Sequence, residues 1–502
     1  MLEKYKEALK YFLNNKIFIS IVILVTILSF GFTIVNYSIG VDDTCLDRYH
    51  AYSEEYKDTN MLAIGRWGSF LLYNLFQIHE FTPFWLDLVM AIVIVITAIF
   101  ACTFIKVQAG DKLKLGVYLV FACVYISYPL INESFIYQTS SFAVLIGILL
   151  MLISLSLIYE SIFKVKNIKN IIIAVLLIIL ASSMYESCCE VFLVAMFFMA
   201  IFRKIFENEK EKNIFKYIFK SLLLLVIGVI INLLIGKGIN LFGIVDSGAA
   251  DKEIFWGTMS LAESIKEIFT YIWVSTLGNM EYFPVFIFVI ASLIGLIIYT
   301  IKAYAKKSTS VIISYAGMFI VNFSFVFIQL FGVLYRASQS WGLFVAIIIA
   351  VAYNHLSEFK ITKNISIFLI FILIMLQTKN LNQLFYNDYI RYQRDLAIAY
   401  ELIDDLETSY DISKPLVIMG TPKKGIGRSG AQVNSLSVLW WGKKAFDDNG
   451  YEFIKFLNSL GYEFKKPTDE QYGKGLNIYK TMERYPENGS IRELDDCIII
   501  NF

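Results

Sequence analysis

Long apolar runs alternate with polar connections along most of the chain. A run of about 20 apolar residues can cross a bilayer as a helix, because each residue adds about 1.5 Å to a helix axis. The pattern predicts about eleven crossings, at residues 17–37, 84–105, 115–130, 139–159, 168–182, 189–203, 219–236, 284–301, 309–332, 338–355 and 364–378. The runs at 168–182 and 189–203 are short, so we expect them to extend into flanking polar residues or to tilt little.

The connections between the runs are of two alternating kinds. One kind is short and rich in lysine and arginine, and the other is acidic, aromatic or rich in Asn, Ser and Gly. The positive-inside rule places the basic kind in the cytoplasm and the other kind outside. A lysine cluster precedes the first run, so the N-terminus is expected in the cytoplasm. An odd number of crossings then puts the C-terminus outside the membrane.

Two outer connections, residues 38–82 and 241–283, are too long to be turns. Apolar and aromatic residues recur in them near helical spacing. This spacing predicts helices that lie flat at the water–lipid interface, on the outer side of the membrane that the apolar runs cross. The stripe of the first connection is Leu62, Trp67, Phe70, Leu71, Asn74 and Leu75, and that of the second is Leu261, Ile265, Ile268, Phe269 and Ile272, ending near Trp273.

The chain changes character near residue 380, where mixed charge at helical spacing favours a soluble helix. PLVIMG and CIIINF read as strands, and GYEFIKFLNSLGYEF and TDEQYGKGLNIYKTMERYP as a helix and a helix-turn. We therefore predict a transmembrane domain over 1–379 and a small extracytoplasmic α/β domain over 380–502. The loop TPKKGIGRSGAQVNS lacks the residue order of a phosphate loop. Its Lys423, Lys424 and Arg428 either meet an anionic head group or are simply solvated.

Composition supports a polytopic helical membrane protein. Hydrophobic residues make up 57% of the chain, charged residues 17%, and the mean hydropathy is +0.61. The net charge of +1 argues against a nucleic-acid partner, since no basic excess exists to neutralise phosphates. No internal repeat is visible, which weakens the reading as an inverted-repeat transporter.

Two adjacent aspartates, Asp42 and Asp43, follow directly on the first apolar run. At the outer water–lipid boundary, such a pair can deprotonate an acceptor hydroxyl or hold a cation beside a lipid-linked phosphate. The alternative is that the two side chains only cap the first helix or begin a loop.

Further charged residues fall at the outer ends of predicted helices. Glu133 and Glu186 lie in otherwise apolar surroundings, where a carboxylate is costly and a functional candidate by default. Arg66 and Arg336 are the arginines that the topology places to hold a phosphate leaving group. The alternative for both glutamates is pairing with one of these arginines or facing water.

Four segments in order, VDDTCLDRYH, AIGRWGSFLLYNLF, NESFIYQTSSFAVLIGILL and SSMYESCCEVFLV, resemble the bacterial Gtr type-two glucosyltransferase family. The ending YPENGSIRELDDCIIINF is also similar to the ending of that family. Members include serotype-converting enzymes that decorate O-antigen, and the family looks like part of the wider GT-C superfamily. Thr44 and Cys45 depart from the family, which more often has aromatic residues there.

The resemblance implies a transferase of the bacterial cytoplasmic membrane that moves a glucosyl (hexosyl) residue from a polyprenyl-phosphate donor to a cell-surface polysaccharide. It implies site roles most strongly at Asp42, Asp43, Gly65, Arg66 and Trp67, then at Glu133, Tyr137, Gln138 and Glu186, and at Arg336. A sugar on a lipid phosphate is already activated, so no nucleotide-binding fold is needed.

The chemistry requires a carboxylate that takes the acceptor proton, which Asp42 or Asp43 fits, and a single displacement would invert the anomeric centre. A divalent cation, Mg²⁺ or Mn²⁺, held by these aspartates and the donor phosphate is the alternative to a site without metal. The alternative function is a transporter or flippase for lipid-linked saccharides. A membrane acyltransferase would need a histidine in a polar membrane segment, and no well-placed one exists.

Overall fold

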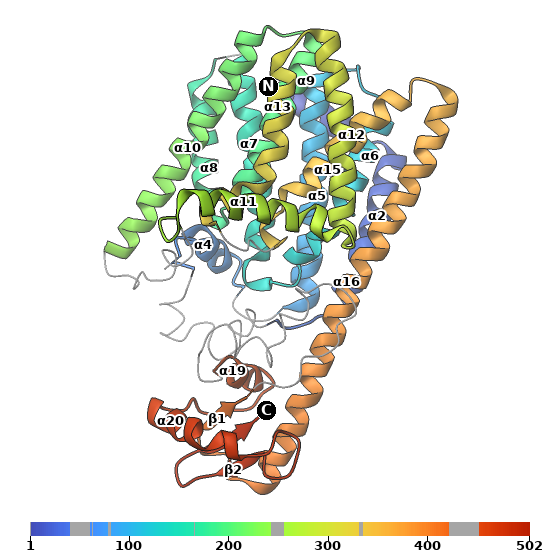
Figure 1. The fold of residues 1–502 in the computed structure, drawn as a ribbon. Coiled ribbons are helices and arrows are strands. Elements are labelled where there is room, and N and C mark those ends of the chain that lie inside the picture. Colours follow the sequence, from blue (N-terminus) through green and yellow to red (C-terminus); the bar gives the residue numbers. More distant parts are fainter. Residues whose placement is uncertain are drawn as a thin grey trace.

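The structure, a computed structural model, describes residues 2–40, 61–62, 64–78, 82–164, 166–241, 256–330, 335–420 and 451–502. A bundle of long helices is joined to a small α/β domain by one very long helix (Figure 1). Asp42, Asp43 and the cationic loop 421–430 lie outside the described residues.

The bundle helices are α2 (Lys16–Val35), α5 (Pro83–Ala109), α6 (Leu115–Ile126), α7 (Gln138–Phe163), α8 (Ile168–Met184), α9 (Cys188–Glu207), α10 (Glu211–Leu241), α12 (Phe283–Lys306), α13 (Thr309–Ile320), α14 (Ser324–Gln329), α15 (Ser340–Leu356) and the first part of α16 (Lys360–Ser409). Within the described residues, 7 helical segments are long and apolar enough to cross a membrane, while α6, α8 and α15 are shorter apolar helices. The chain is thus built as a multi-pass membrane protein. The count of about eleven crossings stays a prediction.

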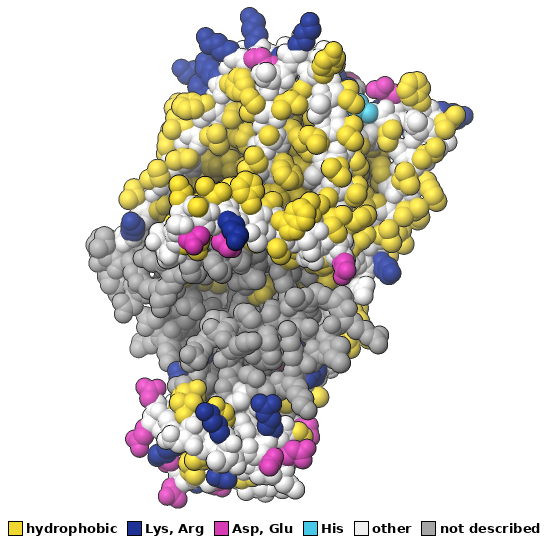
Figure 2. All heavy atoms as spheres, viewed as in Figure 1, with side chains coloured by type: hydrophobic (Ala, Val, Ile, Leu, Met, Phe, Trp, Pro, Cys, Tyr) yellow, Lys and Arg dark blue, Asp and Glu magenta, His cyan; other side chains and the backbone are white. Residues whose placement is uncertain are grey.

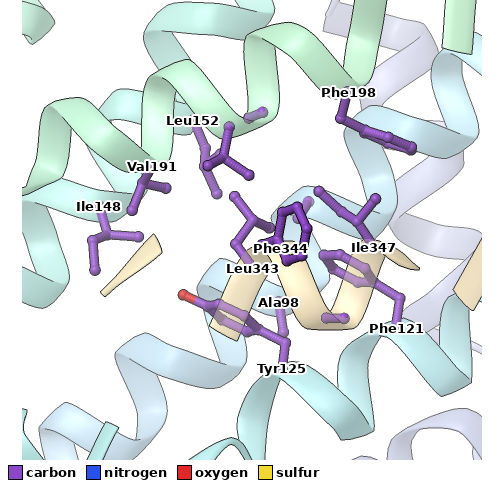
Figure 3. Close-up of a cluster of buried hydrophobic side chains, with 14 of the residues drawn as sticks. Ala98, Phe121, Tyr125, Ile148, Leu152, Val191, Phe198, Leu343, Phe344 and Ile347 are labelled. Carbon is purple, nitrogen blue, oxygen red and sulfur yellow. The ribbon is translucent and has the colours of Figure 1, made fainter. Parts of the chain in front are cut away.

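The bundle is apolar both inside and outside. Phe121, Phe344 and Ile347 interdigitate in its buried centre (Figure 3). Outward-facing Leu234 and Phe368 are 63% and 62% exposed, and such side chains form the broad apolar belt of Figure 2. A continuous apolar surface of this kind is unfavourable in water and is the surface that lipid chains solvate.

One end of the bundle is basic, and we call it the lysine-rich end. Lysine and arginine side chains gather there, at the end away from the C-terminal domain (Figure 2). A polar network connects three helices at this end: Lys204 Nζ lies 3.2 Å from Glu211 Oε1, and Ser308 Oγ donates a 2.5 Å hydrogen bond to the same oxygen. The helix α1 (Leu2–Leu13), which the sequence analysis did not predict, docks nearby through buried Phe12, whose ring meets that of Tyr118.

The opposite end, which we call the domain end, carries short helices that lie across the bundle. In α11 (Leu261–Ser275), Ile265, Phe269 and Trp273 form an exposed apolar stripe, and the helix runs across the bundle axis (Figure 1). This confirms the predicted second amphipathic helix. The first predicted segment contains α4 (Trp67–Leu75), and its residues 41–60 lie outside the described part.

The helix α16 has 50 residues and is therefore about 75 Å long. The sequence analysis predicted two helices here, a crossing that ends near 378 and a soluble helix from about 380. The structure joins them into one, because no Pro or Gly interrupts the stretch and the backbone hydrogen bonds continue without a break. The residues of the helix change from mainly apolar to mixed and polar near residue 380, but the helix continues.

The C-terminal domain has three layers around a small sheet of β1 (Leu416–Met419), β2 (Ile491–Glu493) and β3 (Ile498–Asn501) in the order β1-β3-β2. β1 and β3 are parallel, and β2 is antiparallel to β3. Alternate strand residues face opposite sides, as the strand period of two requires. One face packs on α16 and α19 (Tyr451–Ser459), and the other packs on α20 (Asp469–Ile478).

The strands predicted from PLVIMG and CIIINF are confirmed, as are the helices at α19 and α20. The strand β2 was missed, since Ile491–Glu493 is only three residues long and mostly polar.

Candidate active site

The segment Gly65–Arg66–Trp67 forms a tight turn at the domain end. The Gly65 amide donates to Leu62 O at 3.0 Å, and the Arg66 amide donates to Met61 O at 2.6 Å. Gly65 has φ +81°, a left-handed conformation that residues with a Cβ rarely adopt. This turn places Arg66 immediately before the first residue of α4.

The helix α4 packs closely on the end of α8. Ser69 Oγ donates a 2.7 Å hydrogen bond to the backbone oxygen of Met184, and both residues are buried. A Cβ at Gly68 would overlap Ser183 Oγ and lie 3.0 Å from the Leu180 carbonyl oxygen. Only a residue without a side chain allows this approach, so Gly68 sets the distance between α4 and α8.

Trp67 connects α4 to α10. Its indole Nε1–H donates a 2.7 Å hydrogen bond to Oδ1 of Asn232, a buried amide in the middle of an apolar helix. Hydrogen bonding satisfies the one polar atom of the indole ring, while the ring itself packs against Leu62. The Gly65–Trp67 turn is thereby held from two sides, by α8 and by α10.

Arg66 meets Glu186, which follows the C-terminus of α8. The Nη2 atom of Arg66 lies 3.1 Å from Glu186 Oε2, and its Nε lies 3.3 Å from the same oxygen. The guanidinium carbon also lies 4.3 Å above the centre of the Tyr185 ring. The Arg66 side chain is 26% exposed and that of Glu186 is 47% exposed, so the pair opens to the surface. The sequence analysis weighed pairing with an arginine as the alternative role of Glu186, and this pairing is present.

A second carboxylate, Glu190, lies one helical turn further along α9 and points into the bundle. It is buried and accepts hydrogen bonds from Ser324 Oγ at 2.6 Å and Ser340 Oγ at 3.0 Å. These partners begin α14 and α15. The α8–α9 turn therefore has Glu186 on its exposed side and Glu190 on its buried side.

The short 3-10 turns η2 (Pro129–Ser134) and η6 (Tyr335–Ala337) pack against each other and carry the backbones of Glu133 and Arg336. The side chains of these two residues lie outside the described part. A small cavity at this junction is lined by Tyr125, Tyr128, Leu130, Ile131, Ile148, Ser338, Gln339 and Gly342. Glu133 and Arg336, which are far apart in sequence, thus sit on adjoining elements.

Tyr137 and Gln138 begin α7. Tyr137 precedes the helix and is buried with Ile136, and its carbonyl oxygen accepts a hydrogen bond from Ser141 Oγ. The Gln138 side chain lies outside the described part. Because α7 packs against both α4 and η2, it connects the helix that follows Arg66 to the η2–η6 junction.

The predicted site residues fall into two groups. Gly65, Arg66, Trp67 and Glu186 come together at α4, and Glu133, Tyr137, Gln138 and Arg336 lie on η2, η6 and the start of α7. Within the described ranges, no three His, Cys, Asp or Glu residues group as metal ligands. The candidate cation ligands Asp42 and Asp43 lie outside those ranges.

Two residues of this region were missed in the sequence analysis, Asn232 and Glu190. Asn232 is an isolated amide in the apolar run of α10, and a polar residue in such a run is a usual sign of a function or a helix contact. Glu190 follows Glu186 by four residues and lies in the first turn of α9, directly after the α8–α9 turn that carries Glu186. In both cases the signal was present in the sequence.

Together, the fold and the site define a multi-pass membrane protein whose charged and aromatic side chains converge at one end of an apolar bundle. Residues 31–353 match the family described as Glucosyl transferase GtrII. The match covers well over half of the chain, so this protein belongs to that family and is a glucosyltransferase. The resemblance inferred from the short motifs is confirmed. Neither a curated protein nor a solved structure matches the chain.

The close approach at Gly68 yields a prediction. Gly68→Ala adds a methyl group against Ser183 and the Leu180 backbone, so we expect a loss of about 1–3 kcal/mol of stability and reduced glucosyl transfer. The measurement is the thermal melting temperature in detergent, together with transfer in membranes. Gly238→Ala is the matched control, since a Cβ there has nothing within 4 Å. Equal melting temperatures for both variants would contradict the proposed packing constraint.

Proposed function

We propose that the protein transfers a glucosyl residue from a polyprenyl-phosphate donor to a cell-surface polysaccharide, at the domain end of the bundle and outside the bacterial cytoplasmic membrane. The observation that supports this most is the partly exposed Arg66 guanidinium, which Glu186, Tyr185 and the α4 turn hold at the end of an apolar bundle. The chain's membership in a glucosyl transferase family supplies the reaction class.

Arg66 is suited to binding the donor phosphate. A phosphate on a lipid lies at the interface between hydrocarbon and water, where the α4 turn ends the apolar part of the bundle. An ion pair as exposed as Arg66–Glu186 contributes about 1 kcal/mol or less, so a phosphate can displace Glu186 at little cost. The guanidinium fork then binds two phosphate oxygens, while the Tyr185 ring keeps its plane in place.

A carboxylate takes the proton of the acceptor hydroxyl as the new bond forms. The acceptor oxygen attacks the anomeric carbon, the bond from that carbon to the phosphate oxygen breaks, and polyprenyl phosphate leaves with the electron pair. This single displacement inverts the anomeric centre. We assign the base to Asp42 or Asp43, with Glu186 and Glu133 as further carboxylates of the site and with Mg²⁺ or Mn²⁺ as a cation that the aspartate pair suits.

The orientation follows from the charge distribution. Lysine and arginine gather at the lysine-rich end, and the positive-inside rule places that end in the cytoplasm. The N-terminus is then cytoplasmic, and α4, α11 and the C-terminal domain lie outside. On that side, we propose that the C-terminal domain helps to select the polysaccharide acceptor.

The first test concerns the donor. Arg66→Ala should raise the KM for polyprenyl-phosphate glucose at least tenfold, because two charge-assisted hydrogen bonds are lost. Arg66→Lys should recover only part of the affinity, since a point charge replaces a planar fork. The exposed arginine Arg484, in the C-terminal domain, serves as the Arg484→Ala control and should leave the donor KM unchanged. An unchanged KM in Arg66→Ala would remove Arg66 from the donor site.

The second test concerns the base. Asp42→Asn or Asp43→Asn should lower kcat by about 10²–10⁴-fold, with normal expression, because loss of a general base has this effect. The transfer of radiolabelled sugar in membranes, counted after lipid extraction, measures kcat. Full activity of both single variants and of the double variant would show that neither aspartate is the base.

The third test concerns orientation. In a Cys45→Ser background, Asn488→Cys should react with a membrane-impermeant maleimide in spheroplasts, because Asn488 is exposed on the C-terminal domain. The matched variant Lys306→Cys, at the lysine-rich end, should react only after lysis. The reverse result would place α4 and Arg66 in the cytoplasm and would refute transfer on the outer face.

A further inference from the structure

A buried group of charges lies on α16 between the bundle and the C-terminal domain. Asp388, Arg391 and Asp395 are 2%, 7% and 3% exposed. Arg391 Nε lies 3.0 Å from Asp388 Oδ1, and its Nη1 lies 3.1 Å from Asp395 Oδ2. Among ion pairs of the described residues, these are the ones in which both side chains are less than a tenth exposed. We call this group the Arg391 cluster.

The spacing in the sequence brings the three side chains together. Asp388 and Asp395 lie three residues before and four residues after Arg391, so all three share one face of the helix. Before and after the cluster this face is apolar, with Leu381 and Leu384 on one side and Ala399 and Leu402 on the other. Burying charges is costly compared with continuing an apolar stripe. Stability alone therefore explains the cluster poorly. Compared with apolar side chains, the three charged side chains add directional hydrogen bonds.

The segment that leaves α2 contacts the cluster. Ser38 Oγ donates a hydrogen bond to Asp388 Oδ2. On either side of Ser38, the Tyr37 ring packs on Tyr392 at 5.6 Å, and Ile39 is buried in the core of the C-terminal domain. Residues 37–40 belong to no helix or strand. The contacts of Tyr37, Ser38 and Ile39 with α16 and with the domain core therefore help to hold this segment in place.

We propose that the Arg391 cluster is a positioning site, which fixes residues 37–40 on α16 and so sets where the chain delivers Asp42 and Asp43. Gly40 lies two residues before Asp42, and an extended chain gains about 3.3–3.6 Å per residue. This inference rests on the proposed function for its catalytic consequence, while the anchoring itself can be tested separately.

The same arrangement connects the C-terminal domain to the reaction. The face of α16 that holds Ser38 at Asp388 continues into the domain core at Ala399 and Leu402. A displacement of the domain along or around α16 therefore moves the segment that leads to Asp42. The domain is then part of the catalytic geometry as well as a surface for an acceptor.

The test uses the full-length protein and a thiol at position 39. Ile39→Cys in a Cys45→Ser background places a reporter where the native side chain is 7% exposed. Arg391→Met removes the guanidinium and should speed maleimide labelling of this thiol at least tenfold. Arg391→Lys, which keeps the charge, should give an intermediate rate. The native thiol of Cys497, which is buried in the C-terminal domain, is the folding control. It must stay unlabelled, which shows that the domain is still folded.

Kinetics supply the second readout. Arg391→Met should lower kcat for glucosyl transfer by about 10–100-fold, since a small misplacement of a catalytic group has effects of this size, and leave the donor KM within about twofold. Lys414→Met is the matched control, because it removes a more exposed ion pair of the same domain, Lys414–Glu493 at 2.6 Å. It should change neither the labelling rate nor kcat.

The outcomes separate the two proposals. Slow labelling at position 39 in Arg391→Met would overturn the anchoring role, whatever the activity. Fast labelling with unchanged kcat would overturn the catalytic consequence while leaving the transferase assignment intact. Fast labelling in a protein whose parent shows no transfer would support the anchoring and refute the proposed function.

Discussion

Hydrocarbon offers no hydrogen bonds, and this constraint organises the whole molecule. A helix satisfies its own backbone inside a bilayer, but a polar side chain there needs a partner within the protein. Accordingly, the outer belt and the centre of the bundle are apolar, and its charged groups lie mainly at the two ends. The exceptions, such as Glu190 and Asn232, are buried and hydrogen-bonded to named partners.

The α8–α9 turn is where this constraint produces a site. The Glu186 side chain points to the surface and pairs with Arg66. The Glu190 side chain points into the bundle and accepts hydrogen bonds from Ser324 and Ser340. One short connection therefore relates the α4 turn to the beginnings of α14 and α15. The buried carboxylate links α9 to α14 and α15, and the exposed carboxylate pairs with an arginine that is itself partly exposed. In the function proposed above, this exposed pair is the one that the donor phosphate opens.

The long helix α16 extends the same framework beyond the membrane. A bilayer core requires about 20 residues of helix, so more than half of the 50 residues of α16 project past it. That projecting part runs beside the end of α2, as the contact of Phe32 with Tyr386 shows, and then forms one layer of the C-terminal domain. The bundle and the domain thus share one continuous helix.

The sequence by itself determined the class of the protein, the positions of the apolar helices, the amphipathic helix α11 and the two main strands of the C-terminal domain. These features depend on local periodicity and on the match between apolar length and bilayer thickness, which a single chain displays directly. The short motif around Arg66 also indicated the family.

Only the tertiary structure decided which charged groups meet. Arg66 and Glu186 are separated by 120 residues, and Ser38 and Asp388 by 350, and no periodicity relates residues so far apart. The continuity of α16 was hidden for a different reason, because its residues change from apolar to polar near residue 380 while the backbone stays helical. Partner choice and helix continuity depend on packing in three dimensions, whereas the pattern along the chain reports mainly on the solvent that each residue faces.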